Sequence, residues 1–125
     1  MPRTTTATAT VLIVDDEPDV RAVLTEIVES RGYLADTAVD GAAALRRVID
    51  LRPQLVLLDV DMPRLRGGEA LVAIRELCPE TNVIMISGKA DLVEARRALS
   101  LGAFDYIGKP FDVAYLIQAI EAAAL

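Results

Sequence analysis

The chain has 125 residues, of which 53% are hydrophobic and 26% charged, a composition typical of one globular domain with a single core. Its net charge of −6 excludes the basic surface that this segment would need to bind nucleic acid non-specifically. The absence of histidine excludes a Ser/His/Asp triad and histidine metal ligands, and the single cysteine, Cys78, excludes an intrachain disulfide.

The first nine residues, 1–9, are rich in threonine and lack the apolar core of a signal peptide. We therefore predict a flexible N-terminal tail over 1–9 and one folded domain over 10–125. No apolar run approaches the roughly 20 residues of a membrane span. Together with the lone cysteine, this favours a cytoplasmic protein that does not enter a membrane.

The first two strand–helix pairs follow the tail. The run "TVLIVD" (10–15) lacks alternation, as expected of a strand buried on both faces. The helix predicted over 17–32 carries apolar residues at helical spacing, namely Val20, Val23, Leu24, Ile27 and Val28. A second strand is predicted over 33–38. Asp40 then caps a helix over 41–50 that places Leu45, Val48 and Ile49 on one face.

Three more pairs complete the chain. Each predicted strand is a short apolar run, and each predicted helix begins at glycines or at an aspartate cap. The strands are predicted over 54–59, 82–87 and 104–108, and the helices over 67–77 (with Leu71 and Ile74 inward), 92–102 (capped by Asp91) and 113–125 (capped by Asp112).

Strands that alternate with helices predict a parallel sheet with helices on both faces, because parallel crossovers are right-handed and cover the sheet. Five strands suit the strand order 2-1-3-4-5 better than the six-stranded alternative. We therefore predict a doubly wound α/β fold of the flavodoxin-like type. In such folds, ligands bind outside the carboxyl ends of the strands.

Polar side chains gather at those strand ends. The first strand ends in Asp15 and Asp16, the third in Asp59 with Asp61 nearby, the fourth in Ser87 and the fifth near Lys109. Taken singly, each is commonly a helix cap, a turn residue or a solvated lysine. Together, neighbouring carboxylates repel by roughly 4 kcal/mol per pair at an effective dielectric of 20. One lysine cannot offset that, whereas a divalent cation can. Oxygen ligands favour Mg²⁺, Mn²⁺ or Ca²⁺ over zinc.

Asp59 is the better candidate nucleophile, because it ends a buried strand beside the acids of the first strand. Asp61 lies in the following loop, where we expect its backbone carbonyl to turn inward and its side chain to turn outward. An aspartate that accepts a phosphoryl group needs a metal to shield charge, and a hydroxyl and an ammonium to bind the phosphoryl oxygens. Ser87 and Lys109 supply the last two groups.

With these residues in place, the sequence resembles the receiver domain of bacterial two-component response regulators. The motifs are "VDDE" (14–17), "LLDVDMP" (57–63), "ISG" (86–88) and "GAFDYIGKPF" (102–111), and the match runs from about Val11 to the C-terminus. The resemblance implies a receiver domain over 10–125. It also implies a metal site for Mg²⁺, with Mn²⁺ possible, formed by the Asp16 and Asp59 carboxylates and the Asp61 carbonyl, with Asp15 acting through water.

The same resemblance implies the signalling roles. A sensor histidine kinase or a phosphotransfer protein would phosphorylate Asp59, and Ser87 with Lys109 would bind the phosphoryl group. Ser87 and Tyr106 would then switch rotamer together and alter a face over 90–115, which would bind a downstream effector, an output domain or a second copy. The domain would be a switch and not an enzyme with an external substrate. The Lys109–Pro110 bond would be cis.

Four residues stand at positions that depart from the common pattern or vary within the family. Arg64 and Arg66 replace a glycine and an aspartate, and put positive charge near the mouth of the cleft unless both are simply solvated. Asp61 and Lys89 each lie two residues beyond a site residue, on loops that face each other. An ion pair between them is a hypothetical gate over the phosphoryl group; the alternative is two solvated side chains.

Two other functions fit part of the sequence. "DVDMP" also matches the Asp-x-Asp motif of haloacid-dehalogenase-type phosphatases, but in those the motif ends the first strand and the metal-binding acids come late. Here the acidic pair comes first. A degenerate receiver that only binds proteins is the third possibility, and the presence of all five site residues argues against it.

Overall fold

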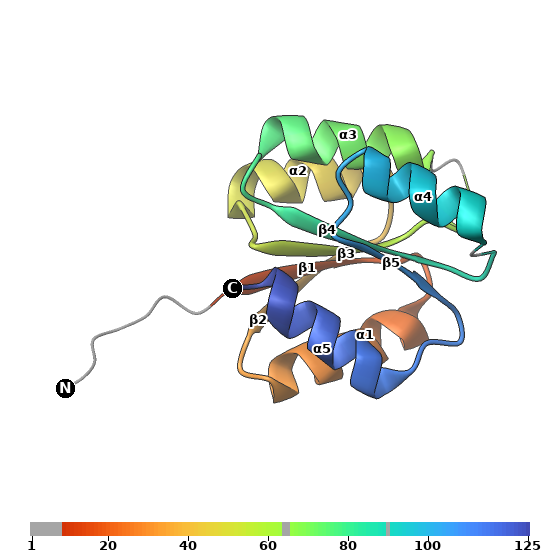
Figure 1. Ribbon diagram of the computed structural model, residues 1–125. Helices are drawn as coiled ribbons and strands as arrows, with labels where there is room; N and C mark the ends of the chain where they lie inside the picture. Colours follow the sequence, from red (N-terminus) through yellow and green to blue (C-terminus); the bar gives the residue numbers. More distant parts are fainter. Residues whose placement is uncertain (1–8, 64–65, 90) are drawn as a thin grey trace.

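The computed structural model describes residues 9–63, 66–89 and 91–125 (Figure 1). Residues 1–8 of the predicted tail, Arg64 and Ala90 lie outside the described residues. The strands are β1 (Thr10–Val14), β2 (Leu34–Ala38), β3 (Leu55–Asp59), β4 (Asn82–Ser87) and β5 (Asp105–Gly108). The helices are α1 (Pro18–Ser30), α2 (Gly41–Leu51), α3 (Gly67–Leu77), α4 (Leu92–Ser100) and α5 (Val113–Ala123).

The strands form one parallel sheet in the order β2-β1-β3-β4-β5, which confirms the predicted topology. Helices α1 and α5 cover one face, and α2, α3 and α4 cover the other (Figure 1). The register pairs Val14 with Leu58 and Ser87 with Gly108. The carboxyl ends of β1, β3, β4 and β5 are therefore level along one edge of the sheet.

The central strands are apolar except at their ends, as suits strands that are covered on both faces. In β1, Leu12 and Val14 pack toward α2 and α3, while Val11 and Ile13 pack toward α1 and α5. All four side chains are at most 1% exposed. The final residue of β3, Asp59, is held in this rigid layer, so its carboxylate has a fixed position at the sheet edge.

The three predicted aspartate caps are present. The carboxylates of Asp40, Asp91 and Asp112 accept hydrogen bonds from backbone N–H groups in the first turns of α2, α4 and α5, at 2.7, 2.8 and 2.9 Å. These bonds satisfy donors that a helix leaves free at its start. The caps fix where each helix begins after its strand, and so fix the loops at the sheet edge.

The inward face of two helices is narrower than expected. Val23 and Ile49 were predicted to face the core, but they are 51% and 54% exposed. The buried residues of α1 are Leu24 and Val28, and those of α2 are Ala44 and Val48. Successive side chains of a helix point about 100° apart. Val23 precedes the buried Leu24 and Ile49 follows the buried Val48, so both side chains point away from the core.

The predicted inward residues of α3, Leu71 and Ile74, are fully buried, and so is Cys78 at the end of that helix. Arg66 is exposed at the start of α3. Of the helices described here, none combines the length and the apolar character needed to cross a membrane.

Candidate phosphoryl-acceptor site

The site lies at the carboxyl edge of the sheet, where four strands each deliver one side chain. Asp15 follows β1, Asp59 ends β3, Ser87 ends β4 and Lys109 follows β5. Asp15, Asp59 and Ser87 are 1%, 4% and 2% exposed. The backbone N–H of Lys109 donates to the carbonyl of Ser87 at 2.8 Å, which ties the ends of β4 and β5 together. The structure therefore brings together the residues that the sequence predicted would meet.

Asp15 and Asp59 form a pair of buried, neighbouring carboxyl groups. Burial raises the pKa of Asp15 to about 6, and the charge of Asp59 and a hydrogen bond with it add to the increase. The backbone N–H of Glu17, which donates to Asp15 Oδ1 at 2.9 Å, and the charge of Lys109 partly oppose it. The pair thus holds more negative charge than its protein surroundings compensate.

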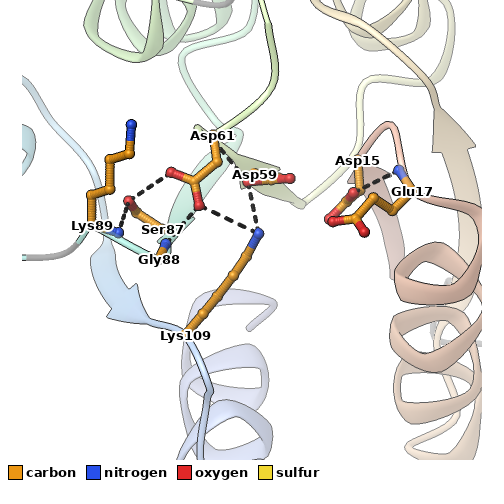
Figure 2. A network of polar contacts seen from close by, with 8 residues as sticks. All are labelled: Asp15, Glu17, Asp59, Asp61, Ser87, Gly88, Lys89 and Lys109. Carbon is orange, nitrogen blue, oxygen red and sulfur yellow. Dashed lines mark hydrogen bonds and ion pairs between the residues drawn. The ribbon is translucent and has the colours of Figure 1, made fainter.

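Lys109 provides the positive charge on the other side of Asp59. Its Nζ lies 3.1 Å from Asp59 Oδ1 and 3.5 Å from Asp61 Oδ2, between the two carboxylates (Figure 2). Burial alone would lower its pKa, but the hydrogen bond and charge of Asp59, and then the charges of Asp15 and Asp61, raise it. The ammonium group therefore stays charged between the carboxylates of Asp59 and Asp61.

The Asp61 side chain turns inward, which corrects our expectation that it turns outward. Its Oδ1 accepts a hydrogen bond from Ser87 Oγ at 3.0 Å, and its Oδ2 accepts one from the N–H of Gly88 at 2.6 Å (Figure 2). Partial burial would raise the pKa of Asp61, but these donors and Lys109 lower it. Its own N–H donates to Asp59 Oδ1 at 2.9 Å, so the loop backbone is anchored to the Asp59 carboxylate.

Lys89 does not pair with Asp61 as the gate hypothesis expected. Among the described residues, the cation paired with Asp61 is Lys109. The Lys89 backbone N–H donates to Ser87 Oγ at 2.9 Å, and its side chain extends away from the centre of the site (Figure 2). The gate of Asp61 and Lys89 over a phosphoryl group on Asp59 stays a prediction.

Oxygen donors suited to a hard cation gather at the start of the first loop. Asp15, Asp16 and Glu17 each place one carboxylate oxygen within 4.8 Å of the others, and Asp59 lies beside Asp15. Carboxylate oxygens alone suit Mg²⁺ or Mn²⁺, and the raised pKa of Asp15 marks uncompensated negative charge that such an ion would balance. The residues present therefore fit the ion. Glu17 was not singled out from the sequence, although it is the last letter of "VDDE".

Tyr106 lies half-buried on β5 and lines a cavity of about 380 Å³ under α4. Asp61, Ser87 and Lys89 line the same cavity. Tyr106 and the Ser87 hydroxyl that bonds Asp61 therefore border one space. The Lys109–Pro110 peptide bond is cis, which confirms the expectation from the sequence.

Comparison with known proteins agrees with this geometry. Residues 11–121 match the family model described as the response regulator receiver domain. The chain is 42% identical over 115 residues to the nitrogen assimilation regulatory protein NtrX of Azorhizobium caulinodans. This match covers 90% of the chain and 25% of that protein. The transcriptional regulatory protein PrrA of Mycobacterium tuberculosis is 38% identical over 112 residues, covering 90% of the chain and 48% of that protein.

Among solved structures, a CheY-like response regulator receiver domain protein from Methanospirillum hungatei superposes with a TM-score of 0.86. It is 29% identical, and the match covers 93% of each chain. The chain thus spans between a quarter and a half of the two curated relatives named above. Family, fold and site geometry agree: the chain belongs to the response regulator receiver domains, the phosphoryl-accepting switches of two-component signalling.

Proposed function

We propose that Asp59 accepts the phosphoryl group. The observation that carries this proposal is the position of its carboxylate at the end of β3, between the acids Asp15 and Asp16 and the donors Lys109 and Ser87. A nucleophile in this place has anionic ligands for a metal on one side and phosphoryl-binding donors on the other.

We assign the Mg²⁺ site to the carboxylates of Asp16 and Asp59 and the backbone carbonyl of Asp61, with Asp15 acting through water; Mn²⁺ would serve as well. Glu17 adjoins this set. A bound divalent cation supplies charge neutralisation between the acceptor carboxylate and the phosphoryl oxygens. The all-oxygen donor set and the raised pKa of Asp15 support the assignment.

The chemical step transfers a phosphoryl group from a phosphohistidine of a sensor histidine kinase or a phosphotransfer protein. An Asp59 oxygen attacks phosphorus in line, the P–N bond breaks, and the imidazole leaves with its electron pair. Lys109 Nζ and Ser87 Oγ donate hydrogen bonds to the phosphoryl oxygens. A carboxylate nucleophile needs no general base, in keeping with a chain that contains no histidine.

The output follows from the Ser87 contact. When Ser87 bonds the phosphoryl group, Tyr106 moves into the cavity beside it and the face formed by α4, β5 and α5 changes. A downstream effector, an output domain or a second copy of the chain would bind there. We propose that the switch works in the cytoplasm and turns over no external substrate.

Labelling with radioactive acetyl phosphate or a phosphorylated kinase in Mg²⁺ tests the acceptor. Wild type should take up one phosphoryl group and lose it slowly, whereas Asp59→Asn should take up none while its circular dichroism stays native. Asp61→Asn is the matched control and should still be labelled. Label that survives in Asp59→Asn but disappears in Asp61→Asn would show that the acceptor is Asp61. Continuous turnover would indicate a phosphatase, and no labelling of wild type would indicate a degenerate receiver.

A further inference from the structure

Three donors from different segments converge on the carboxylate of Asp61. They are the hydroxyl of Ser87 at the end of β4, the N–H of Gly88 in the next loop and the ammonium of Lys109 after β5 (Figure 2). The Asp61 side chain is 26% exposed, so its carboxylate is partly withdrawn from solvent and contacts protein donors. Hydrogen bonds of this kind, with an ionised acceptor, are stronger than neutral ones.

Two of these donors are the groups assigned above to the phosphoryl oxygens, and this inference rests on that assignment. A serine hydroxyl has one hydrogen to donate, and so has a backbone N–H. Ser87 therefore cannot bond Asp61 and a phosphoryl oxygen at the same time. Lys109 has three hydrogens and already bridges Asp59 and Asp61, so it can serve both groups.

The local backbone supports the close approach. Gly88 has no side chain, and a Cβ there would lie 3.2 Å from Asp61 Oδ2. The Asp61 backbone is held by its N–H bond to Asp59 Oδ1. The carboxylate can thus leave its donors by rotation of the side chain, without movement of the loop.

We propose that the carboxylate of Asp61 is an internal competitor of the phosphoryl group. In the unphosphorylated domain it occupies the donors of Ser87 and Gly88, and it must rotate away before Ser87 can bind a phosphoryl oxygen. The free energy of that rotation lowers the apparent affinity of the site for phosphoryl-like ligands, because only the rotated fraction is competent to bind. Asp61 is thereby a positioning residue that sets how readily the switch turns on.

Titration with beryllofluoride, a phosphoryl analogue, in Mg²⁺ tests the competition. Asp61→Asn keeps the size and the backbone but weakens the bonds to Ser87 and Gly88, so its apparent Kd should fall by about tenfold. Asp91→Asn is the matched control: it also removes one carboxylate beside the same cavity, and asparagine still caps α4. Its Kd should stay within about twofold of wild type. Equal Kd values for wild type and Asp61→Asn, or an equal gain in both variants, would overturn the proposal.

A second measurement needs neither metal nor phosphoryl analogue. In wild type, the Gly88 amide proton should resonate downfield, since it is bonded to a carboxylate at 2.6 Å. In metal-free Asp61→Asn and Asp61→Ala it should move upfield. If the Gly88 resonance does not change, Asp61 does not bond the Gly88 N–H and the proposed competition is wrong, even if Asp59 is labelled as proposed. If, conversely, Asp59 is not the phosphoryl acceptor, the labelling experiment will show it, and the shift of the Gly88 resonance will still be seen.

Discussion

Among single residues, Asp15 carries the clearest electrostatic strain of the metal-free domain. Its pKa is raised to about 6 by burial and by Asp59, against 3.8 for an ordinary aspartate. Between these values the folded state holds a proton that the unfolded chain has released. The stability contributed by this proton is therefore complete below about pH 4 and is lost as the pH rises through about 6.

Asp15→Asn removes this titration and keeps an oxygen to accept the Glu17 N–H. In EDTA, the free energy of unfolding of the variant should gain on that of wild type by on the order of 1–3 kcal/mol between pH 4 and pH 7. Urea denaturation at four pH values across that interval provides the measurement. A difference between the two proteins that stays constant with pH would mean that Asp15 is not strained.

The acids at the site were predictable, but the direction of one side chain was not. Asp15 and Asp59 follow apolar runs, and parallel strand ends must share an edge, so their meeting follows from the order of elements. The inward turn of Asp61 depends on Ser87, Gly88 and Lys109 reaching one point from two other loops. No local pattern around Asp61 encodes that convergence.

At the scale of elements, hydrogen bonds link Ser87 of the site to the segments just before α4 and just after β5. Ser87 accepts a bond from the N–H of Lys89, just before α4, and its carbonyl accepts one from Lys109, just after β5. The face formed by α4, β5 and α5 exposes apolar side chains: Leu92 and Val93 are 64% and 74% exposed, and Phe104 and Tyr115 are 41% and 48% exposed. This face is therefore linked to Ser87 and exposes apolar side chains suited to contact a partner.

Beryllofluoride with Mg²⁺ should change amide hydrogen exchange across 92–115, because rebonding of Ser87 shifts its hydrogen bonds before the start of α4 and after the end of β5. Helix α2, which packs on β1 and β2 toward the edge of the sheet opposite β5, is the internal control and should change little (Figure 1). The Ala90 end of the predicted face lies outside the described residues. Changes restricted to the neighbours of Asp59 would refute the coupling.

The starts of three helices could be predicted from local chemistry, whereas the side chains that face the core could be predicted less well. The caps at Asp40, Asp91 and Asp112 could be predicted from the sequence, because a carboxylate just before a helix accepts hydrogen bonds from the free N–H groups of its first turn. Val23 and Ile49 were wrongly placed in the core. Each lies next to a buried residue of its helix, and the spacing of apolar residues does not tell on which side of the buried residues the helix is also covered. Only the packing of α1 and α2 against the sheet decides which side is covered.

For the whole molecule, a net charge of −6 and the gathering of acids at one sheet edge make metal binding and folding interdependent. An ion that binds the folded site and not the unfolded chain stabilises by RT ln(1 + [L]/Kd), about 1.4 kcal/mol at ten times Kd. For a domain of this size, that is a rise of several degrees in Tm. Mn²⁺ should act in the same direction.

The size of this rise should depend on Asp16 more than on Asp15, because we assign Asp16 as a direct ligand and Asp15 as one that acts through water. Calorimetric scans in EDTA and in 10 mM Mg²⁺, at matched ionic strength, give the increase in Tm that Mg²⁺ causes in each variant. Because each variant is compared with itself, this increase is separate from the change in stability that Asp15→Asn causes without metal. Asp16→Asn should lose most of the increase, and Asp15→Asn should keep part of it. A wild-type Tm that ignores Mg²⁺ would count against the site as a whole, and a larger loss in Asp15→Asn would exchange the roles of the two acids.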